Sequence, residues 1–177
     1  DYLKAEIHRE GKVFVQEYSQ GKPYKPVEVT GEAEDTGTIV TFHPDPEIFQ
    51  VTTVYKYDTL AARLRELAYL NKGIHLSLTD KRTLINDVDE NGNELESTHY
   101  RSDVFYSKEG LREFVDYLDG GAEKLIENPV YLETDKIIPI EIALQYNTSY
   151  TEKIYSYVNN INTIEGGTHL QGFKMGL

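Results

Sequence analysis

The alternation of apolar and polar residues in the first 43 positions most strongly constrains the fold. Leu3, Ala5 and Ile7 share one face of an expected strand, and the turn REGK follows before VFVQEY runs back. Further strands are expected at VEVTGE and GTIVTFHPD, and Pro44 and Pro46 end the second of these because proline has no N–H for a ladder. Strands joined by such short turns predict antiparallel pairing.

Two segments have the apolar spacing of amphipathic helices. In YDTLAARLRELAYLNKG, Asp58 is placed to cap the helix and Gly73 to end it. In SKEGLREFVDYLDGG, Ser107 is the expected cap and Gly120-Gly121 the stop. Arg63 and Arg65 lie off the apolar stripe of the first helix, so we expect them to be solvated.

The rest of the chain adds strands and a third helix start. IHLSLTDKR reads as one strand, three more are expected in 129–160, and Thr168 is placed to cap a final helix. The order predicts an α+β chain, mainly antiparallel sheet with two or three helices. The residues expected to be buried in the second half are Ile140, Ile142, Leu144, Ile154 and Tyr157.

Composition describes a soluble domain that does not grip nucleic acid by itself. The 177 residues carry a net charge of −12, which repels a phosphate backbone, and the basic residues are not gathered in one segment. No apolar run approaches the roughly 20 residues that span a bilayer. The absence of cysteine fits a reducing compartment, so we expect a cytoplasmic protein.

The polar segment 85–103 contains the strongest local hint of a metal site. Asp87, Asp89 and Asn91-Gly92 match the start of a calcium-binding EF-hand loop. The match then fails, because Thr98 stands where the bidentate glutamate is required and Glu94 replaces an apolar residue. Asn91-Gly92 also favours a tight hairpin turn. We therefore expect a long hairpin or a flexible loop rather than a calcium site.

No local pattern carries catalytic chemistry. The histidines lie far apart without metal-ligand spacing, and no serine stands in a nucleophile elbow. Thr38, in EDTGTIVTF, has two interpretations: an ordinary strand residue, which the pattern alone favours, or the edge of a pocket that holds a heterocycle. The five histidines without metal-ligand spacing are His8, His43, His75, His99 and His169. We therefore assign no catalytic and no metal-binding residue.

Several blocks, taken in order, resemble the ATPase component of type IIA DNA topoisomerases, DNA gyrase B. They cover nearly the whole chain except for the segment 85–103. The sharpest are EGGTHLQGF and TEKIYSYVNNINT, and the glycine-threonine-histidine block is shared with topoisomerase IV, which remains an alternative. The other blocks are REGKVFVQEYSQGKP, TGTIVTFHPDPEIF, LAARLRELAYLNKGI, EGLREFVDYL and IEIALQYN.

The resemblance implies two domains. Residues 1–105 are expected to be the C-terminal part of a GHKL-type ATPase domain, and residues 106–177 the N-terminal part of a transducer domain of the ribosomal protein S5 domain 2-like type. It also implies that the general base, the magnesium-binding asparagine and the phosphate loops lie before Asp1. The chain is then expected to stop just inside a longer helix at Leu177.

The resemblance implies few site residues. Thr38 matches the threonine that contacts adenine with an ordered water, and Val40 matches a residue lining the same pocket. Arg9 matches the arginine at the pocket mouth against which aminocoumarin inhibitors rest. ATP and magnesium are implied for the full-length protein, and neither is expected to be bound by this fragment, which we expect to be inactive alone.

The resemblance also implies partners. They are the A subunit of gyrase and a second B subunit, in a heterotetramer that contacts DNA through other domains and that couples ATP hydrolysis to supercoiling. No membrane partner is expected. The alternative from composition alone is a non-enzymatic α+β module that holds a protein partner through its acidic, tyrosine-rich surface.

Overall fold

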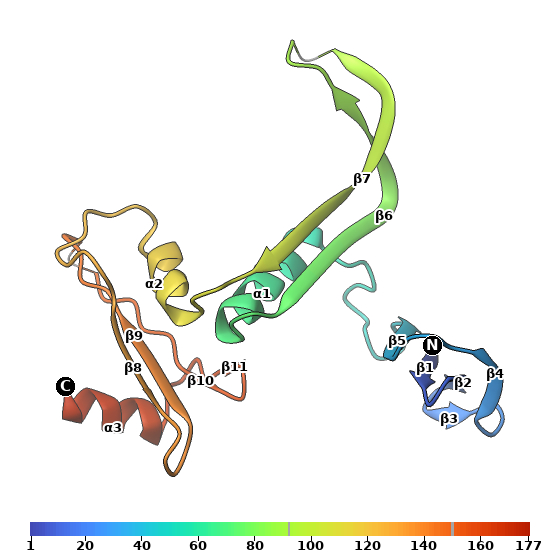
Figure 1. Ribbon diagram of the computed structural model, residues 1–177, viewed down its shortest axis with the longest axis horizontal. Helices are drawn as coiled ribbons and strands as arrows, with labels where there is room; N and C mark the ends of the chain where they lie inside the picture. Colours follow the sequence, from blue (N-terminus) through green and yellow to red (C-terminus); the bar gives the residue numbers. More distant parts are fainter. Residues whose placement is uncertain (92, 150) are drawn as a thin grey trace. The chain divides into compact units, whose positions relative to one another are not determined.

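The computed structural model describes residues 1–91, 93–149 and 151–177 (Figure 1). It confirms the α+β class: the described strands pair antiparallel, and the described residues form three α-helices. Contacts divide the chain into two compact units, Asp1–Tyr55 and Lys56–Leu177. Among the described residues, no helix is long and apolar enough to cross a membrane.

The first unit is one antiparallel sheet in the order β3-β2-β1-β5, with β4 also paired to β2. The expected turn at REGK is confirmed: Glu10-Gly11 forms a two-residue connection with positive φ of 55° and 75°, and Gln20-Gly21 forms a second one with 48° and 73°. Such turns match the twist of antiparallel strands. The strands are β1 (Tyr2–Arg9), β2 (Lys12–Ser19), β3 (Lys22–Pro23), β4 (Glu28–Glu32) and β5 (Gly37–His43).

The second unit is organised around α1 (Tyr57–Leu70), which packs on the hairpin of β6 (His75–Val88) and β7 (Glu94–Tyr106) (Figure 1). Its core joins both elements, because alternate residues at the base of the hairpin point toward the helix. The pairing of β6 with β7 confirms the expected hairpin in 85–103, and Gly92, part of the predicted Asn91-Gly92 turn, lies outside the described residues. The core residues are Tyr57, Ala61, Ala68 and Phe105, with Leu64, Leu76 and Leu78 packed against them.

The caps of α1 differ from the prediction. Lys56, not Asp58, is the N-cap, and no side-chain hydrogen bond caps this end. Asp58 lies in the first turn, where it accepts a 2.6 Å bond from Arg101 of β7. At the other end Asn71 is the C-cap and its amide donates to the carbonyl of Leu67, so the helix ends before Gly73 is reached.

The second helix also begins later than expected. α2 runs from Leu111 to Asp119, with Gly110 as its N-cap and left-handed Gly120 as its C-cap. Ser107 caps the turn that precedes the helix: its Oγ accepts the N–H of Gly110 and donates to Glu113, each at 2.8 Å. Ser107 is fully buried, so it fixes this turn from the inside.

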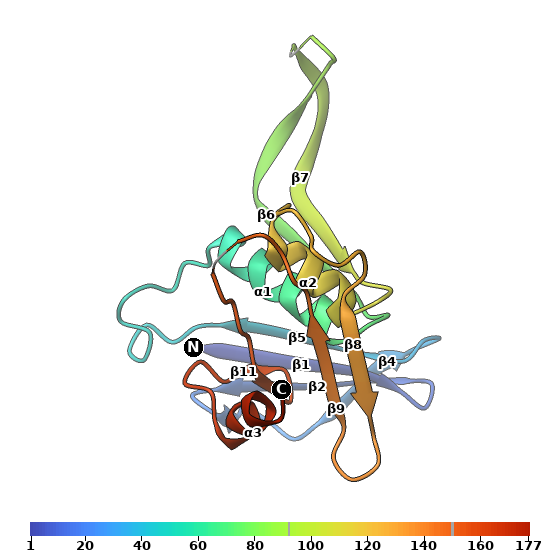
Figure 2. The ribbon, with the colours of Figure 1, turned by 90° about the vertical axis from the view of Figure 1, so that its left-hand side faces the viewer.

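Two hairpins and a helix complete the second unit, and α2 packs against the first hairpin (Figure 2). Thr168 is the first residue of α3 rather than its cap. Of the three strands expected in 129–160, the last is only two residues long, Tyr157–Val158. Ile140 and Ile154 are exposed rather than buried, while the other three residues expected to be buried are half-buried. The elements are β8 (Val130–Thr134), β9 (Ile140–Leu144), β10 (Tyr157–Val158), β11 (Ile161–Asn162) and α3 (Thr168–Gly176).

Candidate functional site

The register of β1 and β5 brings the three expected site residues onto one face of the first sheet. Thr38 lies opposite Ile7, and Val40 lies opposite Ala5. Directly paired residues of an antiparallel sheet point to the same side, as do residues two apart in one strand. Arg9, two residues after Ile7, therefore shares the face of Thr38 and Val40.

This face is apolar and open. Val40 is 53% exposed, as is Phe42 two residues further on, and Ile7 is 41% exposed. Arg9 ends β1 and its guanidinium pairs with Glu10 at 3.3 Å, with both side chains 74% exposed. The apolar side chains of this face can contact a flat ring, and the hydroxyl of Thr38 can hydrogen-bond to a polar atom of that ring. The exposed cation of Arg9 can attract a negatively polarised group.

The opposite face carries a chain of charges along β1. His8 Nδ1 lies 2.7 Å from Asp35, its Nε2 lies 3.3 Å from Glu6, and Glu6 accepts from Lys4 at 2.9 Å. The hydrogen bonds to Asp35 and then to Glu6 raise the pKa of His8. The bond from Lys4, followed by that from His8, lowers the pKa of Glu6, and the bond from His8 lowers the pKa of Asp35. These charges bind one another and fix the start of β5.

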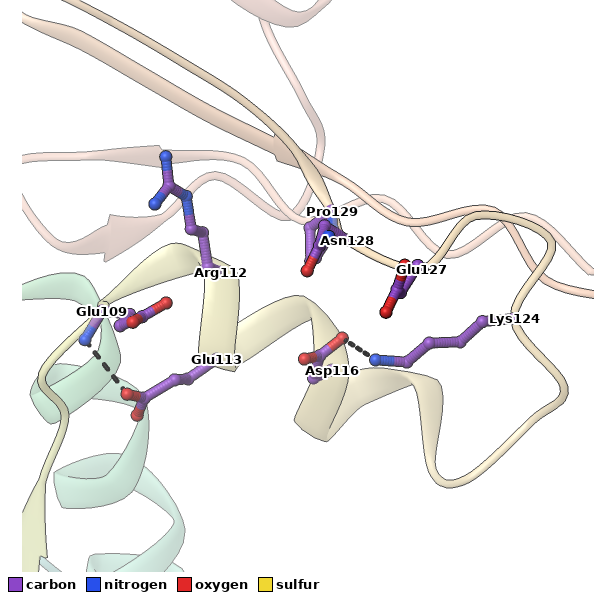
Figure 3. A pocket seen from close by; sticks show the side chains of 8 residues that line it. All are labelled: Glu109, Arg112, Glu113, Asp116, Lys124, Glu127, Asn128 and Pro129. Carbon is purple, nitrogen blue, oxygen red and sulfur yellow. Dashed lines mark hydrogen bonds and ion pairs between the residues drawn. The ribbon is translucent and has the colours of Figure 1, made fainter.

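A cavity of about 490 Å³ lies in the second unit between α2 and the segment 124–129 (Figure 3). Four of its charged side chains make contacts within the protein. Asp116 accepts from Lys124 at 2.7 Å, Glu113 accepts the N–H of Glu109 at 3.0 Å, and Arg112 lies 4.3 Å over the ring of Tyr131. None of the expected site residues lines it. The lining is Glu109, Arg112, Glu113, Asp116, Lys124, Glu127, Asn128 and Pro129.

The acidic hairpin tip uses its side chains to shape the turn. Asp89 accepts the backbone N–H groups of Asn91 and Asn93 at 2.9 and 2.8 Å, and Asp87 lies 2.5 Å from Nδ1 of His99. Within residues 1–91, 93–149 and 151–177, no group of three or more His, Cys, Asp or Glu side chains is placed to hold a metal ion. The geometry supports the hairpin interpretation of this motif.

The two arginines of α1 are half-buried, and each makes a tertiary contact that the expectation of solvated side chains did not include. Arg63 donates to the backbone carbonyl of Asn160 at 2.7 Å. The guanidinium of Arg65 lies 5.5 Å from the ring centre of Phe105 and 5.6 Å from that of Tyr117. Their partners lie far along the chain, so spacing within the helix could not reveal them.

Comparison with known proteins matches nearly the whole chain to DNA gyrase B proteins. The family model for DNA gyrase B matches residues 110–177. The B subunit of DNA gyrase from Eisenibacter elegans is 52% identical over 99% of this chain and 34% of its own length, and that from Halalkalibacterium halodurans is 46% identical over 99% and 25%. The crystal structure of the 43K ATPase domain of Thermus thermophilus gyrase B in complex with an aminocoumarin superposes with a TM-score of 0.79, at 34% identity over 98% of this chain and 44% of that one.

These matches define the class as the ATPase region of type IIA topoisomerase B subunits. Within that class the chain belongs to the DNA gyrase B family, and the names of its relatives favour gyrase over topoisomerase IV. The chain spans 34% of the length of relatives such as that from Eisenibacter elegans.

Proposed function

We propose that this chain is part of the ATP-hydrolysing B subunit of a DNA gyrase, in which ATP binding and hydrolysis drive DNA supercoiling. The observation that carries the proposal is the match to the ATPase domain of Thermus thermophilus gyrase B over 98% of the chain. ATP with magnesium is the proposed cofactor. The proposed partners are the A subunit of gyrase, a second B subunit and DNA bound by other domains, in the cytoplasm.

We assign residues 1–105 to the end of the GHKL-type ATPase domain and residues 106–177 to the beginning of the transducer domain. Under this assignment the first sheet supplies one edge of the nucleotide pocket, through Thr38 and Val40. The helices and hairpins after residue 106 form part of the lever that carries the state of the nucleotide toward DNA. The 177-residue chain alone is expected to hydrolyse no ATP, because no described side chain is assigned to the general base.

Thr38 tests the nucleotide assignment. In the full-length protein, Thr38→Ala should weaken ATP binding about tenfold, the value of one hydrogen bond near 1.4 kcal/mol. Calorimetry with a non-hydrolysable ATP analogue measures this, and Thr41→Ala, on the opposite face of the same strand, is the control. Equal affinity in both variants and the wild type would remove Thr38 from the pocket.

Arg9 tests the inhibitor assignment. Arg9→Ala in the full-length protein should raise the aminocoumarin concentration needed for inhibition roughly tenfold, because a cation that faces the drug is lost. ATP turnover without drug should change less than about twofold, since Arg9 is exposed at the strand end. Lys22→Ala, an exposed lysine on the opposite face of the same sheet, is the control. Equal losses in inhibition and turnover would contradict the drug-contact role.

A further inference from the structure

The hairpin of β10 and β11 lies against α1 through polar contacts. Tyr157 donates its hydroxyl proton to Glu66 at 2.5 Å, and Asn160 donates its amide to Asn71 at 3.0 Å. Arg63 donates to the carbonyl of Asn160 and also pairs with Glu66. Side chains from two distant segments thus complete one another's hydrogen bonds.

Tight backbone geometry presents these groups to the helix. Asn159 and Asn160 both have positive φ, 49° and 66°, in the two-residue turn between β10 and β11. Asparagine tolerates this conformation better than most residues, and the turn holds Tyr157 and Asn160 on the same short hairpin. Burial, followed by the hydrogen bond to Glu66, raises the pKa of Tyr157, so its hydroxyl stays a donor at neutral pH.

The contacts continue from the hairpin to α3. The carbonyl of Ser156, the neighbour of Tyr157, accepts the N–H of Thr163 at 2.8 Å, and the Ser156 hydroxyl lies 2.6 Å from that of Thr163. The Thr163 hydroxyl donates to the carbonyl of Ser156 at 3.0 Å and lies 3.2 Å from Nε2 of His169, the second residue of α3. One hydroxyl therefore joins the hairpin to the start of the helix.

We propose that this series of contacts, the α1–α3 connection, sets the orientation of α3 relative to α1 and thereby couples ATP hydrolysis to supercoiling. It consists of Glu66, Tyr157, Ser156, Thr163 and His169. The inference rests on the proposed function and deepens it, because it assigns the coupling to particular side chains. These are positioning residues, since none lies on the sheet face assigned to nucleotide.

Polar contacts suit such a role. Hydrogen bonds between side chains are directional, so they fix the angle between two elements. Because the net free energy of each bond is small, the bonds can be exchanged for bonds to water when the elements move. A few of them in series also respond as one unit, which double-mutant cycles detect.

Tyr157→Phe in the full-length protein, in complex with the A subunit of gyrase, is the main test. The ring remains and only the hydroxyl is lost, so ATP hydrolysis should stay within about twofold of the wild type while supercoiling per ATP hydrolysed falls at least about threefold. Tyr155→Phe is the matched control: both rings lie near Phe114, at 6.3 and 6.4 Å, and Tyr155 has no part in the connection. Hydrogen exchange of the α3 amides should accelerate in the first variant only.

Thr163 provides a second variant at the other end of the connection. Thr163→Val removes the hydroxyl at constant shape and should reproduce the loss, Thr163→Ser should restore it, and the double variant with Tyr157→Phe should lose no more than either alone. The inference is overturned if both single variants match Tyr155→Phe, or if hydrolysis and supercoiling fall in parallel. A wild-type protein without ATP-dependent supercoiling would refute the proposed function instead, and the hydrogen exchange of α3 would still test the connection.

Discussion

The two compact units differ in what holds them together. None of residues 1–55 is buried. The strands of the first unit form one sheet, which is held together by hydrogen-bond ladders. The buried residues of the described chain all lie in the second unit, where a helix covers one face of a hairpin. An antiparallel sheet holds its register through its ladders, and apolar burial adds stability only where a second layer covers a face.

The difference fits the role proposed for the first sheet. A sheet face that is not occupied by its own core can become the wall of a binding site, and Thr38 and Val40 lie on such a face. In the second unit, α1 and the hairpin of β6 and β7 precede the elements proposed to form the lever, and their packed core gives α2, which contacts α1, a rigid support.

Phe105→Ala should have the largest effect on stability and tests the contrast directly. Phe105 is 6% exposed in the core of the second unit, so its loss should cost about 3–5 kcal/mol of unfolding free energy, measured by denaturant titration. Val104, its neighbour on the opposite face, is 71% exposed, and Val104→Ala should cost less than about 0.5 kcal/mol. Phe42→Ala in the first unit should cost about 1 kcal/mol, because Phe42 is 53% exposed. Equal costs for Phe42 and Phe105 would remove the distinction between the units.

Ser107→Ala should have an intermediate effect. The fully buried hydroxyl joins the N–H of Gly110 to the carboxylate of Glu113, and its removal leaves a buried donor unpaired. Such a loss costs about 1–3 kcal/mol. Thermal unfolding should show a clear decrease for Ser107→Ala and almost none for Ser149→Ala, at an exposed site. An unchanged midpoint for Ser107→Ala would mean that the turn does not depend on this cap.

His8→Gln should have the smallest effect, visible only as a pH dependence. The contacts to Asp35 and Glu6 raise the folded-state pKa of His8, so the stability they provide is complete below its usual pKa near 6.5 and is lost as pH rises through the higher folded value. As the pH rises above about 6.5, the unfolding midpoint of the wild type should therefore fall relative to that of His8→Gln. His75→Gln, in the second unit, should keep the wild-type slope. A slope unchanged in His8→Gln would show that the His8 contacts do not persist in solution.

Sequence patterns predicted the elements better than their ends. The strands of the first unit follow from alternation and from turn residues such as Glu10-Gly11, because both signals are local. The caps Asp58 and Thr168 were wrong, since several polar residues stand near each helix start and tertiary contacts select among them. Asp58 pairs with Arg101 of a distant strand instead.

The site was predictable only in part. The face shared by Arg9, Thr38 and Val40 follows from the register, which alternation indicates, but their roles came from resemblance to a family and remain predictions. The contacts of Glu66 with Tyr157 and of Arg63 with Asn160 join positions 91 and 97 residues apart. No local pattern contains information about such pairs.

The irregularity in β6 has a consequence for how this protein can vary. Between Asp80 and Leu84 the pairing with β7 shifts, so the alternation of sides restarts beyond this point. Leu76 and Leu78, which pack against the core with α1, lie before this shift. We therefore expect insertions at the tip of the outer ribbon, such as a reporter peptide, to leave the contacts of the inner hairpin with α1 intact.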